Sequence, residues 1–467
     1  MVIESFWSRI IPAGILGLIL LTACSLMQSG NDWHKPVARQ MQNGQVDQAV
    51  AAIETAYRNG RYASKDRFLY YLDAGLAYHY ATQPDSSNRR LHLAEQTAED
   101  LYTKSVSRTA LSWLWNDNVT EYAGEDYEVL YTNLFKALNF AAQGQWESGM
   151  VEIRRADLKL ELLEQKYADL AAGMNRNQDS NNRIPVTYQA ERVNFHNDAL
   201  ARYLSMHFYA ASGDPDNARV DYDKLVRAFE DQPAIYSFPV PAVNYQPAPG
   251  QAILSVVAMT GLSPVKEKFE LRVRGDKTLD LIQVLYTDTQ NQDAVYHQIP
   301  LRLDQDFYAK LSIPRVVERP GRIAAIRIYT GTQLLGQLQL LENTYSVALE
   351  TFKAKQSLIY LRTVVRVVGK LLGGNRLKQE VDNPHFDGWL KKLLVDVYTD
   401  WSESADIRCS RLLPGKIWVG DFELPPGDYP VRLEFLDEGG YPVSVQTIPS
   451  SRVSAGRMNL VEASCFQ

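Results

Sequence analysis

Cysteine is scarce in this sequence, with three residues in a chain of 467. So low a count excludes a fold held by many disulfides and a zinc site built on two C-x-x-C pairs. Cys24 ends an apolar run, whereas Cys409 and Cys465 both lie in the C-terminal region. In an oxidising compartment these last two either form a disulfide or remain isolated buried thiols. The sequence leaves both alternatives open.

Recognised catalytic motifs are missing as well. The seven histidines are scattered without an H-E-x-x-H pair, and no G-x-S-x-G, P-loop or G-x-G-x-x-G occurs. Asp304 and Asp306 come closest to paired carboxylates, because residues two apart on a strand point the same way. Such a pair can bind a metal or flank a glycosidic bond, but solvated acids at a strand end are favoured. We therefore predict no catalytic, cofactor or metal residues, and a protein that is not an enzyme.

No apolar run near the start of the chain is long enough to cross a membrane. The run Ile10–Leu21 has twelve residues, whereas a spanning helix needs about 20. Arg9 precedes the run and small residues follow it, which is the pattern of an export signal.

Four residues at the end of this run resemble the lipobox of bacterial lipoproteins: Leu21, Thr22, Ala23 and Cys24. The motif needs a cysteine because its thiolate is the nucleophile that is alkylated. We therefore predict a signal peptide at 1–23, a lipid on Cys24 and a tether at 24–31. Ser25 replaces the Asp that would indicate inner-membrane retention. The periplasmic face of the outer membrane is thus favoured over the inner membrane or the cell surface.

Positive charge is not in excess either, since the formal net charge is −6. An acidic balance argues against a nucleic-acid partner and against broad adhesion to anionic lipid. We expect the partners to be envelope proteins, with the membrane reached through the lipid anchor.

Proline is rare between residues 32 and 232, and apolar residues recur there with helical spacing. Gly44, Gly144 and Gly213 each stand in a turn ahead of an amphipathic stretch. Their separations lie near multiples of the 34-residue period of tetratricopeptide repeats. Stacked helix pairs of that kind leave a concave groove for a peptide or a partner protein. The alternative is an irregular helical domain in which the glycines only end helices.

The composition changes after this helical region. Residues 233–251 are rich in proline and predict an extended linker. Strand-like runs follow in 252–341 and again in 400–467, where DYPVRLEFLDEGGYPVSVQTI alternates as an antiparallel hairpin does. Short strands of this kind predict a β-sandwich-like domain.

A helical insert at 342–399 separates the two groups of strands. Three cations lie on one side of its LIYLRTVVRVVGKLL stretch: Arg362, Arg366 and Lys370. This stripe is either the solvated side of a helix pair packed on the β domain, or a face that meets the membrane or an acidic partner.

Three longer stretches carry a resemblance: DYEVLYTNLFKALNFAAQGQWESGMVEIRRAD, GLSPVKEKFELRV and ADIRCSRLLPGKIWVGDFELPPGDY. Together with the lipobox, they resemble an uncharacterised family of proteobacterial lipoproteins with helical repeats in front of a β-domain. The resemblance spans roughly residues 40 to 440. Members are often encoded beside a small lipoprotein similar to activators of penicillin-binding proteins. The resemblance implies a role in the cell envelope, but it implies no reaction and no site residues.

We therefore expect an α+β multidomain protein, with tetratricopeptide-like helices followed by a β-sandwich-like domain. Its predicted function is a lipid-anchored scaffold or adaptor, linked to peptidoglycan synthesis or outer-membrane assembly. The alternative is an envelope glycan-binding protein or hydrolase.

Overall fold

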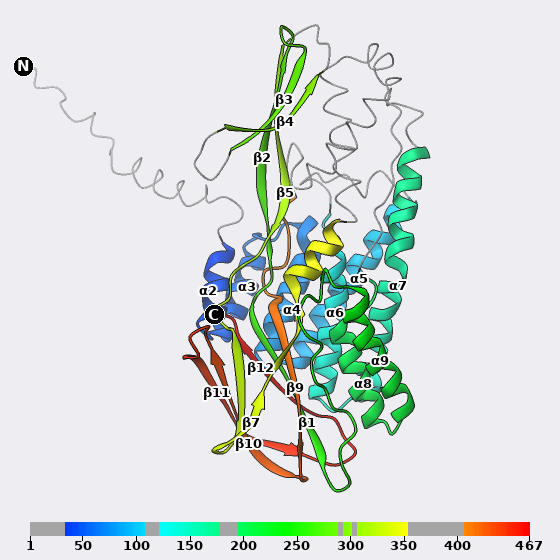
Figure 1. Ribbon diagram of the computed structural model, residues 1–467, viewed down its shortest axis with the longest axis vertical. Helices are drawn as coiled ribbons and strands as arrows, with labels where there is room; N and C mark the ends of the chain where they lie inside the picture. The colour runs from blue at the N-terminus through cyan, green and yellow to red at the C-terminus, as the bar shows by residue number, and fades with distance from the viewer. Residues whose placement is uncertain (1–32, 108–120, 177–194, 288–292, 301–305, 354–405) are drawn as a thin grey trace, which may run out of the picture.

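The computed structural model describes residues 33–107, 121–176, 195–287, 293–300, 306–353 and 406–467. Helices fill the N-terminal part of the chain, and strands dominate the part that follows (Figure 1). The predicted α+β class and the order of helices before strands are confirmed.

The helices follow one another in joined pairs: α2 with α3, α4 with α5, α6 with α7, and α8 with α9. Their bounds are α2 His34–Gln42, α3 Val46–Arg58, α4 Arg67–Tyr80, α5 Pro84–Ser107, α6 Asp126–Ala142, α7 Trp146–Arg176, α8 Ala199–Ala211 and α9 Pro215–Asp231, with the short 3-10 helix η2 Ser64–Asp66 before α4.

Each pair turns at a residue in the left-handed region of backbone space. Gly44, Gly144 and Gly213 have φ angles of 71°, 71° and 75°. Thr82 holds the same place between α4 and α5 with φ of 54°. The residue after each of the four donates its amide to the carbonyl five positions back. Glycine is favoured in such a turn because it has no Cβ to crowd the backbone. The predicted glycine turns are confirmed, and Thr82 supplies one that the glycine pattern does not mark.

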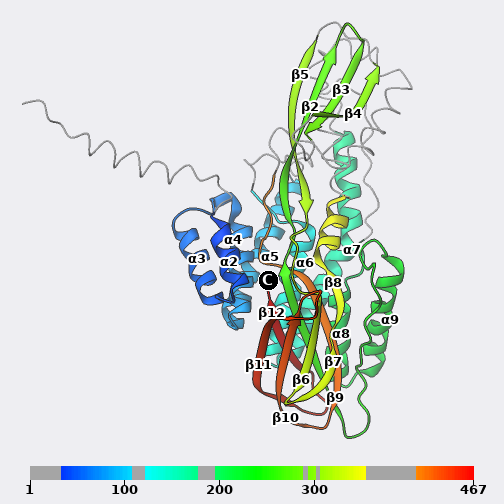
Figure 2. The same cartoon turned by 60° about the vertical axis from the view of Figure 1, so that its left-hand side comes forward.

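The helices lie in two layers. Helices α4, α6 and α8 form an inner layer and are buried over most of their surface; Leu130–Asn139 of α6 is buried without a break. Helices α5, α7 and α9 lie on the side away from the strands β1 and β9 (Figures 1 and 2). Exposed Leu158 and Leu162 on α7 show that this outer layer has a solvent-facing side.

The described strands form three four-stranded sheets, with the orders β12-β1-β9-β8, β11-β10-β6-β7 and β4-β3-β2-β5. Their bounds are β1 Ala252–Leu262, β2 Val265–Asp276, β3 Leu281–Thr287, β4 Asp293–Pro300, β5 Phe307–Val317, β6 Ala325–Thr330, β7 Gln333–Gln337, β8 Gln339–Asn343, β9 Pro414–Leu424, β10 Gly427–Leu436, β11 Pro442–Val453 and β12 Asn459–Cys465.

The first two sheets share one apolar core. Val256 of β1 and Val461 of β12 belong to the same buried cluster as Ile328 of β6 and Leu433 of β10. The opposite face of β1, with Val257, joins the core of the helices. Every residue of β1 is therefore buried, which explains why AILSVVAM is apolar without the alternation of a half-exposed strand.

The third sheet is separate from these two. Strands β2 to β5 extend away from the helices and the other sheets (Figures 1 and 2). In this sheet β2 pairs with β3 and β5 and not with the strands of the other two sheets. The predicted single β domain over 252–341 stays a prediction.

The segment 233–251 contains no helix or strand, has turns at 233–235 and 249–250, and is held to the rest of the protein at several points. The Tyr236 side chain is buried, the Ala242 amide donates to Gln339 Oε1 at 2.5 Å, and the Asn244 amide donates to Asp421 Oδ2 at 3.0 Å. Helical and β parts thus share packing and do not move on a free linker. The insert begins as a helix at 344–353; its remainder lies outside the described residues.

Within the part of the chain that the structure describes, no helix combines the length and the apolar character needed to cross a membrane.

Candidate functional site

All the residues predicted for the anchor and for the basic interaction face lie outside the described residues. These are Leu21, Thr22, Ala23, Cys24, Arg362, Arg366 and Lys370.

The two C-terminal cysteines are free and buried, so the disulfide alternative is wrong in this structure. Cys409 Sγ accepts the amide of Lys266 at 3.4 Å. Cys465 ends β12 and packs in the core between the first two sheets. Since the thiols lie in different surroundings, the fold does not bring them together, and burial raises the pKa of both.

Of the two predicted paired carboxylates, Asp304 and Asp306, the structure describes only Asp306. Asp306 is exposed, and its Oδ1 accepts the amide of Lys277 at 2.9 Å, while Asp304 lies outside the described residues. Asp306 thus supports a turn at the end of the third sheet. Among the described residues, no group of three or more His, Cys, Asp or Glu side chains is arranged to hold a metal ion.

The inner helical layer faces the chain's own strands. His79 of α4 contacts Asn139 at 2.8 Å and Glu462 of β12 at 3.2 Å through its two ring nitrogens. Tyr80 donates to the Leu412 carbonyl at 3.1 Å and packs edge-on against Phe466. The chain itself therefore covers this side of the helices, and a groove for a partner has to lie elsewhere on them.

One contact across this internal boundary has the residue types of a hydrolase triad. His207 of α8 approaches Asp421 of β9 at 3.1 Å and Ser255 of β1 at 3.4 Å. Tyr203 also donates to Asp421 at 2.8 Å. Ser255 is only 1% exposed, so a substrate carbonyl cannot reach its hydroxyl. The cluster joins α8 to the sheet and is not an active site.

An open cleft of about 650 Å³ lies on the outer layer, between α5 and α7 and next to the start of α6. Leu158 and Leu162 of α7 line it and are 54% and 53% exposed. Tyr102 of α5 lines the same cleft and is also exposed. Large apolar side chains beside a concave surface are typical of binding sites, and this cleft is the candidate site.

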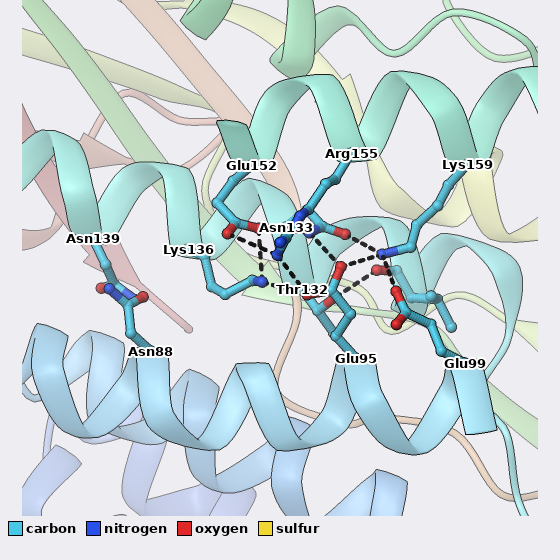
Figure 3. A network of polar contacts seen from close by, with 11 residues as sticks. Asn88, Glu95, Glu99, Thr132, Asn133, Lys136, Asn139, Glu152, Arg155 and Lys159 are labelled. Carbon is cyan, nitrogen blue, oxygen red and sulfur yellow. Dashed lines mark hydrogen bonds and ion pairs between the residues drawn. The ribbon is translucent and has the colours of Figure 1, made fainter. Parts of the chain in front are cut away.

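A network of charged and amide side chains connects α5, α6 and α7 beside the cleft (Figure 3), and its members Glu95, Arg155 and Lys159 line the cleft. Lys136 of α6 lies between Glu95 of α5 at 2.5 Å and Glu152 of α7 at 2.7 Å. Asn133 donates to both carboxylates, at 2.8 and 2.7 Å. Lys159 reaches Glu95 at 2.5 Å from the cleft side. The network ties three helices together at the wall.

Opposite charges hold Glu95 ionised despite its burial. Burial alone would raise its pKa, but the ammonium groups of Lys159 and Lys136 outweigh that effect and lower the pKa to about 2. With its charge fixed and its oxygens shared among several donors, Glu95 is suited to holding the helices in place and not to proton transfer.

A second ion pair stands farther along the cleft. Lys166 of α7 contacts Asp126 of α6 at 2.5 Å, and Tyr167 donates to the same carboxylate. The Lys166 ammonium also lies 5.9 Å from the centre of the Tyr102 ring, within reach of a cation–π contact. The apolar side chains Leu158 and Leu162 are thus flanked by charges that already have partners.

Sequence reasoning did not find this cleft. The helical period of α7 shows which residues share a face, but it does not show which face stays open. Leu158 and Leu162 match the pattern of core positions as well as that of exposed ones.

The chain matches no known family model, and comparisons with curated proteins and with solved structures find no match either. The resemblance to proteobacterial lipoproteins therefore stays a prediction.

Proposed function

We propose that this protein is a lipid-anchored adaptor of the cell envelope, which binds a helical segment of a partner protein in the cleft between α5 and α7. The observation that carries the proposal is the cleft itself. Its volume of about 650 Å³ lies within the range of roughly 300–1,000 Å³ common for ligand pockets. Exposed Leu158 and Leu162 provide the apolar contact.

A helical occupant fits the shape of the walls. The lining residues of α5 run from His92 to Tyr102, a rise of about 15 Å at 1.5 Å per residue. Those of α7 recur at helical spacing from Arg155 to Lys166. A third helix can place its apolar ridge between two such helices.

The charged residues of the cleft are suited to orienting a bound partner and not to catalysis. Glu95, Lys159, Asp126 and Lys166 already form ion pairs across the helices. A partner therefore gains mainly from apolar burial, at roughly 25 cal/mol per Å². Charges on its polar side would set its direction in the cleft.

The rest of the proposal joins this cleft to the predicted architecture. The four helix pairs of the described chain are interpreted as degenerate tetratricopeptide-like repeats, and the first two sheets as a β-sandwich. With the sandwich against the inner layer, the array becomes a rigid platform that binds on its outer side. A lipid on Cys24 would hold this platform at the periplasmic face of the outer membrane, with links to peptidoglycan synthesis or outer-membrane assembly.

Photo-crosslinking in living cells tests the proposal. A photoreactive residue at Leu158 or Leu162 is expected to capture a defined envelope protein. The matched control is Val151, which lies on the same helix and is 46% exposed but is not among the residues lining the cleft. Capture should be lost when Leu158→Asp is combined with the photoreactive residue at position 162.

Two outcomes would overturn the proposal. Equal capture from position 151 would show contact without use of the cleft. No protein capture, together with retention of the purified protein on isolated peptidoglycan, would replace partner binding by glycan binding.

A further inference from the structure

The N-terminus of helix α8 is buried, so its first amides need acceptors from within the protein. Asp198 is the N-cap residue, and its Oδ1 accepts the amide of Ala201 at 2.6 Å. The amide of Ala199 donates to the Tyr236 hydroxyl at 2.9 Å. Asp198 is fully buried, so water does not satisfy the rest of its carboxyl group.

A second buried carboxyl group lies beside this cap. Glu342 of β8 is within hydrogen-bonding contact of Asp198, and its exposure is 0%. Asp198 Oδ2 and both carboxylate oxygens of Glu342 have no donor among the described residues. Two ionised carboxylates offer each other only acceptors, whereas a proton on either one supplies the missing donor.

The surroundings do not neutralise two negative charges. Arg202 acts on Asp198 electrostatically and lowers its pKa, but the Arg202 guanidinium group contacts Asp157 at 2.8 Å and Asp221 at 3.3 Å. The remaining groups that act on the pair carry no charge: the hydroxyls of Tyr131 of α6 and Tyr236, and the backbone amide of Leu200 at the start of α8. Two like charges buried together without a cation of their own are strongly unfavourable.

We propose that Asp198 and Glu342 share one proton in the folded protein, and that this acid pair makes the joint between helix α8 and strand β8 sensitive to alkaline pH. Loss of the proton leaves two carboxylates in contact and drives them apart. Because α8 belongs to the inner helical layer and β8 to the first sheet, their separation loosens the platform that supports the outer cleft.

The direction of the pH effect follows from the burial of the pair. Burial raises the pKa of Asp198 to about 6, and it also raises the pKa of Glu342. The unfolded chain releases both protons near pH 4, while the folded pair keeps one. Stability contributed by the pair therefore falls as the pH rises above about 4.

The test compares the wild type with Glu342→Gln, which keeps the shape and supplies a permanent N–H donor. Between pH 5 and 9, the ratio of the wild-type to the variant unfolding constant should rise by up to about tenfold per pH unit, as one retained proton requires. The control is Glu438→Gln, at an exposed glutamate, whose ratio to the wild type should stay constant.

Infrared difference spectra detect the shared proton directly, so they distinguish it from a purely structural role of Glu342. At pH 7 the wild-type spectrum minus that of Glu342→Gln should contain the carbonyl band of a buried protonated carboxylic acid; Glu128, whose pKa burial raises to about 7, contributes equally to both spectra. Should that variant fail to fold, Asp198→Asn keeps a capping oxygen and serves for the same two measurements. A constant stability ratio from pH 5 to 9, or no acid band in the difference between the wild type and the variant, overturns the proposal.

Discussion

Removing the charge of Glu95 should lower the free energy of unfolding by an amount that follows from its ion pairs. Glu95→Gln keeps the size of the side chain and an oxygen for Asn133, but it leaves Lys136 with Glu152 alone. The two lysines lower the pKa of Glu95 from 4.5 to about 2, and each unit corresponds to about 1.4 kcal/mol. The expected loss in unfolding free energy at pH 7 is therefore about 3 kcal/mol, within the range for breaking a buried ion pair.

The pH dependence makes this prediction specific. A carboxyl whose pKa is lowered by folding stabilises the protein fully above its unfolded pKa, and this contribution disappears as the pH falls toward the folded value. Urea denaturation should thus show a constant difference between the wild type and Glu95→Gln from pH 7 to about 5. The difference should shrink below pH 4.5 and approach zero near pH 2.

A matched control lies one turn farther along the same helix. The side chain of Glu99 is 60% exposed and lies 3.9 Å from Lys159, so Glu99→Gln should change stability by less than about 0.5 kcal/mol. The reasoning is refuted if both variants lose the same stability at pH 7. It is also refuted if the loss in Glu95→Gln persists unchanged down to pH 3.

Two further predictions concern the turns and the anchor. Thr82→Gly should raise the unfolding free energy by about 1 kcal/mol, and Gly144→Ala should lower it by about 1 kcal/mol, because both positions have a left-handed backbone. Unchanged thermal midpoints in both variants would contradict this. Cys24→Ser should move the protein from the membrane to the soluble fraction, while the control Cys465→Ser should leave it membrane-bound. Equal membrane retention of Cys24→Ser and wild type would remove the lipid anchor from the proposed function.

Local sequence patterns were sufficient where short-range geometry decides the outcome. Gly44, Gly144 and Gly213 mark turns because their conformation is costly for other residues. The alternation in β10 and β11 predicted an antiparallel hairpin, and the structure confirms that pairing, with Val431 and Leu433 buried. In both cases the physical requirement acts between residues close in the chain.

The candidate site could not be predicted in the same way. Glu95 and Lys136 form an ion pair only because α5 and α6 pack together. In the sequence, each residue has the pattern of a solvated charge on a helix. The side of the helices that stays open could not be predicted for a related reason. Periodicity identified a face to be covered, but it did not show that β1, β9 and β12 cover it.

The sequence by itself thus determined the class of fold, the order of helices and strands, and three of the four turns that join the described helix pairs. These depend on backbone conformation and on the spacing of apolar residues. Only the tertiary structure decided which helical side remains open, where the cysteines lie, and that Asp198 and Glu342 meet from distant parts of the chain. Such contacts depend on how complete elements pack against one another, and no local pattern encodes that packing.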